Sequence, residues 1–143
     1  MTGQGSDARS VVIEREFAHP VEKVWRALTQ PYLIAEWLME NDFVPAVGHR
    51  FKLRGDWGGV LDCEVLEIEP GRELSYTWDH AHENPAFDLK SVVTFTLVPT
   101  PAGTRLRVEQ TGFRPDQKQA SGGARVGWSQ FLGKLEAVLQ HHD

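Results

Sequence analysis

The chain has 143 residues, of which 41% are hydrophobic and 24% charged, and this balance fits one soluble globular domain with a single core. Its formal net charge of -5 disfavours nucleic acid and anionic membranes as partners. The single cysteine, Cys63, excludes an internal disulfide and a thiolate metal cluster, and it favours a cytoplasmic location. Residues 1–10 are polar and lack the apolar segment of a signal peptide, so we expect a disordered tail before one domain at residues 11–143.

The first third of the chain predicts a strand followed by two short helices. Alternating apolar and polar residues at 11–17 are typical of a strand. Pro20 is well placed to begin a helix, because its fixed backbone angle suits the first helical turn. Pro31 repeats this signal before a second apolar stripe that includes Trp37. The two helices are therefore expected in tandem.

The middle of the chain changes to a period of two and predicts five strands joined by short turns. They cover residues 49–54, 60–69, 73–79, 89–98 and 104–110. In the second of them the alternation slips between Val65 and Leu66, which predicts a bulge. Pro70 and Gly71 fit the two central positions of a tight turn.

The last predicted element is a long helix over residues 121–140. Ser121 is a candidate N-cap, and Gly122 and Gly123 indicate a frayed or late start. One face of this helix is apolar and comprises Val126, Trp128, Phe131, Leu132, Leu135, Val138 and Leu139. The order of elements predicts an α+β fold in which a curved antiparallel sheet of about six strands wraps around this helix.

Several short motifs together resemble the START-like (SRPBCC) superfamily, and within it the family named after the activator of heat-shock protein 90 ATPase. The resemblance covers residues 11–140. The motifs are Ala18-His19-Pro20, Val24-Trp25-Arg26-Ala27-Leu28-Thr29, Trp37-Leu38, Gly59-Val60, Val65-Leu66-Glu67-Ile68-Glu69-Pro70, Leu74-Ser75-Tyr76-Thr77-Trp78, Gly127-Trp128, Phe131-Leu132 and Leu135.

This resemblance implies a helix-grip fold with a mostly apolar cavity between the sheet and the C-terminal helix. It also implies a protein that binds a hydrophobic or aromatic small molecule. The sequence contains no cofactor motif, so we expect no cofactor, and we expect a monomer or homodimer. The alternative is a co-chaperone-like module that binds a chaperone in a stress response. The co-chaperones that name the family carry an additional N-terminal domain, and 143 residues leave no room for one, which favours the small molecule.

The candidate ligand-binding residues are bulky rings together with polar residues that share the apolar phase of their strands. A polar side chain at such a position needs a partner, so His49 and Ser91 could orient a ligand. The rings could equally fill the core. The full set is Trp37, His49, Phe51, Trp78, Ser91, Phe95, Trp128, Phe131 and Leu132.

Other chemistry has weaker support in the sequence. Arg50, Lys52 and Arg54 form a basic row that could meet an acidic partner surface. Residues 80–83 have the spacing of a metal site but no third and fourth ligand, so we expect no metal there. An enzyme acting through His49 would need a carboxylate across the cavity, which the inward positions do not offer.

Overall fold

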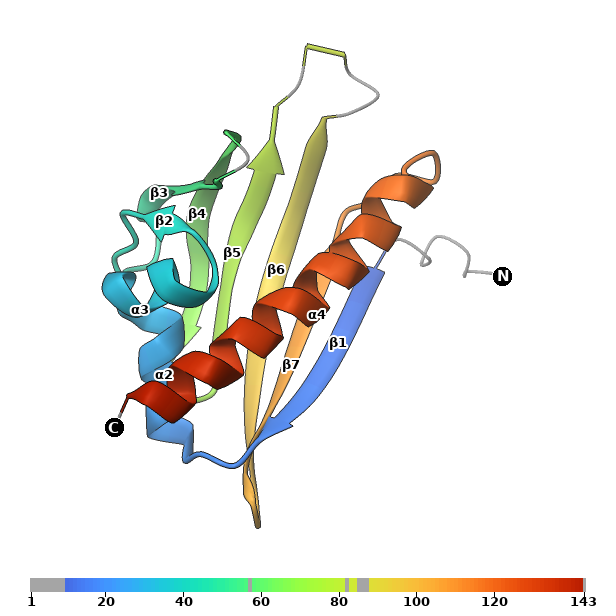
Figure 1. Ribbon diagram of the computed structural model, residues 1–143. Coiled ribbons are helices and arrows are strands. Elements are labelled where there is room, and N and C mark those ends of the chain that lie inside the picture. The colour runs from blue at the N-terminus through green and yellow to red at the C-terminus, as the bar shows by residue number, and fades with distance from the viewer. Residues whose placement is uncertain (1–9, 57, 82, 85–87, 143) are drawn as a thin grey trace.

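We describe the protein from a computed structural model, which defines residues 10–56, 58–81, 83–84 and 88–142. Within these residues, seven strands form one antiparallel sheet in the order β1-β7-β6-β5-β4-β3-β2. The sheet curls around the long helix α4 (Lys118–His141), which crosses its concave face obliquely (Figure 1). The strands are β1 (Ser10–Phe17), β2 (Glu40–Asn41), β3 (Arg50–Arg54), β4 (Val60–Glu69), β5 (Glu73–His80), β6 (Leu89–Thr100) and β7 (Gly103–Thr111).

Two short helices, α2 (Val21–Thr29) and α3 (Pro31–Trp37), lie beside the C-terminal half of α4 and close that side of the molecule (Figure 1). Pro31 is the first residue of α3, as its position in the sequence predicts. Gln30 ends the first helix and precedes the second, and its extended backbone turns the chain between them. The expected tandem of helices is confirmed.

The sequence pattern also predicts local details of the sheet correctly. The register of β4 against β5 shifts between Val65 and Glu67, where the slip in alternation predicts a bulge. Gly71 has a φ of 75°, the left-handed conformation that a proline–glycine turn requires. The predicted α+β helix-grip architecture is therefore the observed one.

The structure differs from the sequence-based expectations in three details. Residues 40–41 form a two-residue strand that pairs with β3, which adds a seventh strand to the six expected. Helix α4 begins at Lys118 and not at Ser121, since Gln117 occupies the cap position. Val126 is 59% exposed, because it lies about 200° around the helix from the buried Trp128.

One continuous core fills the space between the sheet, α2, α3 and α4. Leu132 and Leu135 of α4 are completely buried in it, and so are Phe17 and Phe95 of the sheet. Arg15 shares the inward phase of β1, and its guanidinium reaches Glu136 of α4 at 2.9 Å. The inward arginine thus has the partner that its position requires. None of the helices in the defined parts of the chain is long and apolar enough to cross a membrane.

Candidate functional site

The aromatic side chains predicted to bind a ligand lie together on the inner side of the sheet. Trp37 and Phe95 are almost completely buried, with ring centroids 6.3 Å apart. Trp128 contacts Phe95 at 5.7 Å and Trp78 at 5.2 Å. We call the whole set the inner ring cluster, and it consists of Trp37, Phe43, Phe51, Tyr76, Trp78, Phe95, Trp128 and Phe131.

Two members of the inner ring cluster are not among the predicted site residues. Phe43, in the loop between β2 and β3, lies 5.1 Å from Phe51 and 6.2 Å from Tyr76. Tyr76 lies 5.1 Å from Phe51 and 5.7 Å from Phe95. The sequence contains a signal for Tyr76, because it alternates in phase with Leu74 and Trp78. Phe43 lies in an irregular loop and gives no such signal.

A buried chain of hydrogen bonds fastens α4 to the sheet. The indole nitrogen of Trp128 donates to Oε1 of Gln110 at 2.9 Å, and Nε2 of Gln110 donates to Oγ of Ser91 at 3.0 Å. The Ser91 hydroxyl then donates to the carbonyl oxygen of Trp78 at 2.6 Å. Ser91, predicted to orient a ligand, therefore already has two protein partners in this structure.

A hollow of about 490 Å³ opens beside the inner ring cluster, between α3, β2, the end of β3 and α4. Two predicted residues, Trp37 and Phe131, form part of its wall, and the ammonium of Lys134 lies 6.0 Å from the centroid of the Phe131 ring. Trp37 is held in place because its indole nitrogen donates to the carbonyl oxygen of Ala27 at 2.8 Å. We call this the side hollow, and its lining includes Trp37, Leu38, Arg54, Asp56, Phe131 and Lys134.

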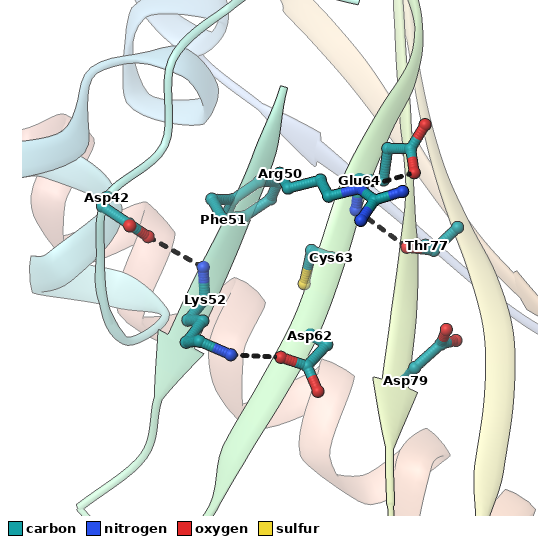
Figure 2. Close-up of a pocket in the computed structure, with 9 residues that line it drawn as sticks. All are labelled: Asp42, Arg50, Phe51, Lys52, Asp62, Cys63, Glu64, Thr77 and Asp79. Atoms are coloured by element: carbon teal, nitrogen blue, oxygen red, sulfur yellow. Dashed lines mark hydrogen bonds and ion pairs between the residues drawn. The ribbon is translucent and has the colours of Figure 1, made fainter. Parts of the chain in front are cut away.

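A second hollow of about 410 Å³ lies on the outer face of β3, β4 and β5, and Figure 2 shows its polar lining. Lys52 forms an ion pair with Asp62 of the neighbouring strand, and Arg50 lies 3.5 Å from Glu64. Thr77 accepts a hydrogen bond from the backbone nitrogen of Glu64. Two of the three cations in the predicted basic row are therefore paired with acids, so the row is not an uncompensated basic surface. Binding to a chaperone stays a prediction.

His49 lies at the edge of the sheet, just before β3. Its ring stacks on Phe51 with centroids 6.2 Å apart, and its Nε2 is 3.0 Å from the carbonyl oxygen of Asp42. It is partly exposed, and the polar contact found for it is with the main chain and not with a carboxylate. Among the described residues, this geometry offers no orienting acid for a general base at this position.

The remaining reactive side chains are placed as follows. Burial raises the pKa of the Cys63 thiol, and the nearby carboxylates of Asp79 and Asp62 raise it further. A neutral, buried thiol is a poor nucleophile, in line with its predicted role as a small apolar residue.

The segment His80–Glu83 has the spacing of a metal site in the sequence. His82 lies outside the described residues, and the described residues contain no group of three side chains that could hold a metal ion.

The curled sheet that grips a long helix, with a ring cluster between them, defines this protein as a START-like helix-grip domain. The model of the activator of Hsp90 ATPase homolog 1-like family matches residues 18–140. The chain belongs to this family. A comparison with curated proteins gives no match.

Solved structures show the same architecture. Protein MLL2253 from Mesorhizobium loti is 68% identical, with a TM-score of 0.92 over 94% of this chain and 99% of that chain. CalU16 from Micromonospora echinospora is 27% identical, with a TM-score of 0.76 over 91% of this chain and 75% of that chain. DynU16, from the dynemicin biosynthetic locus, is 26% identical with a TM-score of 0.81 over 92% of this chain; the match spans 47% of DynU16, about half its length.

Proposed function

We propose that this protein binds an apolar, ring-containing small molecule that enters at the side hollow and moves packed rings of the inner ring cluster apart, so that it lies between the sheet and α4. The observation that carries the proposal is the position of Trp37, which is both a wall of the side hollow and a member of the inner ring cluster. A ligand that enters the side hollow first meets the partly buried ring of Phe131. Rings of this kind favour an apolar partner through buried area and edge-to-face contacts.

The side chains around the opening of the side hollow also favour entry of a ligand there. Phe131 on α4 is only partly buried, so its ring can turn without breaking up the core beneath it. Lys134 and Arg54 place cationic groups around this rim. Their long side chains cover apolar surface with their methylene groups and keep their charges in water. The apolar part of a ligand is therefore expected on the inside.

The origin of one similar structure is consistent with small-molecule binding. DynU16 comes from a biosynthetic locus, and its match covers 92% of this chain. A fold shared by many functions cannot identify the ligand, so the support for small-molecule binding comes mainly from this chain's own side hollow and rings.

The test is a fragment library of aromatic and alicyclic molecules, screened by saturation-transfer NMR and by the thermal shift of the protein. Ala35 on α3 lines the side hollow, and Ala35→Trp should fill it and abolish binding. Val98→Trp adds the same ring at an exposed position of β6 and should leave binding unchanged. The proposal fails if no fragment binds the wild-type protein, or if the fragments bind Ala35→Trp as well as the wild type.

A further inference from the structure

Tyr76 is a buried polar side chain whose hydroxyl makes no hydrogen bond to the described residues. It lies on the inner side of β5 with 3% of its surface exposed, and its ring contacts Phe43, Phe51 and Phe95. Among the residues that the structure defines, no group donates to or accepts from its hydroxyl. Folded proteins rarely leave a buried hydroxyl without a hydrogen-bond partner, because its lost hydration is not replaced.

Three other buried donors of this core, those of Trp37, Trp128 and Thr104, are bonded. The indole nitrogens of Trp37 and Trp128 each have an acceptor, at 2.8 and 2.9 Å. The hydroxyl of Thr104 donates to the carbonyl oxygen of His19 at 2.8 Å. The chain thus satisfies these inward-facing donors, and within its described part it leaves the phenol of Tyr76 free to donate.

The surroundings of the Tyr76 hydroxyl keep it a neutral donor. Burial raises its pKa well above the ordinary range, and the neighbouring Cys63 raises it further, so the phenol is protonated at neutral pH. Cys63 is itself held in its neutral form by burial. A carboxylate or phosphate beside these two groups would be an uncompensated buried charge, whereas a carbonyl oxygen would be a suitable acceptor.

We propose that Tyr76 orients the bound molecule by donating a hydrogen bond to a neutral carbonyl oxygen, so that the preferred ligands are cyclic or aromatic ketones and related carbonyl compounds. The inference rests on the function proposed above and specifies its ligand class. Packed rings separate the side hollow from Tyr76, because Trp37 on the wall of the hollow contacts Phe95, and Phe95 contacts Tyr76. A ligand that reaches the phenol has to move these rings apart. The rings hold the hydrocarbon part while the phenol fixes the oxygen.

The test compares two probes of almost the same shape, 1-indanone and indane, which differ in a single carbonyl group. Their dissociation constants are measured by NMR titration with the wild-type protein, with Tyr76→Phe and with Tyr32→Phe. Tyr32 is the chain's other tyrosine and is 64% exposed on α3, so it is a matched control. The carbonyl stretching frequency of bound 1-indanone provides a second readout, since a hydrogen bond lowers it.

We expect Tyr76→Phe to reduce the preference for 1-indanone over indane by about fivefold, as the loss of one neutral hydrogen bond implies. Indane should bind all three proteins equally, and the carbonyl frequency should rise only in Tyr76→Phe. A preference that is the same in wild type and Tyr76→Phe overturns the inference while leaving the proposed function intact. If neither probe nor any library fragment binds the wild type, the proposed function itself fails.

The stability of the ligand-free protein separates this role from a structural one. Because the hydroxyl has no protein partner among the described residues, Tyr76→Phe should unfold at the same or a slightly higher urea concentration than the wild type. A clear loss of stability in the ligand-free Tyr76→Phe protein would mean that the hydroxyl is already satisfied, which would also overturn the inference.

Discussion

The hydrogen bond between Trp128 and Gln110 is expected to help attach α4 to the sheet, and a double-mutant cycle measures its contribution. Gln110→Met keeps the length of the side chain and removes the acceptor of the Trp128 indole nitrogen, 2.9 Å away. That N–H then stays buried without a partner, because Trp128 is only 2% exposed. A buried donor in this state costs about 1–3 kcal/mol in the free energy of unfolding. Ser91 loses one donor but still bonds the carbonyl oxygen of Trp78.

Trp128→Phe removes the N–H together with part of the ring and leaves a cavity. In the double variant the cavity remains, but no N–H is left unpaired, so the penalty from Gln110→Met disappears. The decreases in unfolding free energy of the two single variants, added together, should therefore exceed the decrease in the double variant by about 1–3 kcal/mol. Equilibrium urea denaturation followed by circular dichroism gives all four free energies. Additivity within about 0.5 kcal/mol would refute the reasoning, and a second cycle of Gln110→Met with the exposed Tyr32→Phe should be additive.

Three further predictions concern backbone and pH. Gly127→Ala should raise the free energy of unfolding by about 0.5–1 kcal/mol, because an added Cβ in this helix meets nothing within 4 Å; a loss of stability would contradict the described course of α4. Gly112→Ala should lower the free energy of unfolding by about 2 kcal/mol or more, because the φ of Gly112 is 117° and the new Cβ would overlap the carbonyl oxygen of Lys90. Thermal denaturation compares both glycine variants with the wild type. Stability should fall as the pH rises above the ordinary thiol pKa of 9.0, because unfolded Cys63 releases its proton there while the folded protein retains it. Urea denaturation at several pH values should show a smaller fall for Cys63→Ala, and equal slopes would contradict the buried, neutral thiol.

The sheet was predictable because the alternation of apolar and polar residues shows which side of each strand faces the core. In β3 buried and exposed residues alternate, and in β6 buried residues alternate with half-buried ones, so a period of two identifies both the strand and its inner side. The strand β2 could not be found in this way, because two residues have no period and are defined only by their pairing with β3. Likewise, α4 begins before Ser121, and part of what holds its start is distant in the sequence: the side chain of Gln117 accepts from the backbone nitrogen of Arg114 and donates to the carbonyl oxygen of Asp88.

The position of the candidate site's rings was predictable, but not which of them border a hollow. A ring on the inner phase of a strand is directed toward the core, and Phe51, Trp78 and Phe95 all lie there. Whether such a ring borders a hollow depends on neighbours that are distant in the sequence. Trp37 borders the side hollow because α3 and α4 meet beside β2, and no window of the sequence contains all three elements. His49 shares the inward phase of its strand, but it lies one residue before β3 begins and bonds the main chain at the sheet edge.

Two hydrogen-bond donors in the same core show why composition alone could not separate a structural from a binding role. Trp128 and Tyr76 are both aromatic, both nearly fully buried and both in contact with Phe95. The indole N–H of Trp128 has an acceptor on β7, so removing it should weaken the ligand-free protein. The phenol of Tyr76 has no such partner among the described residues, so removing it should cost the ligand-free protein nothing and affect only a ligand that brings an acceptor. The opposite expectations for two neighbouring rings follow from their partners and not from their residue types.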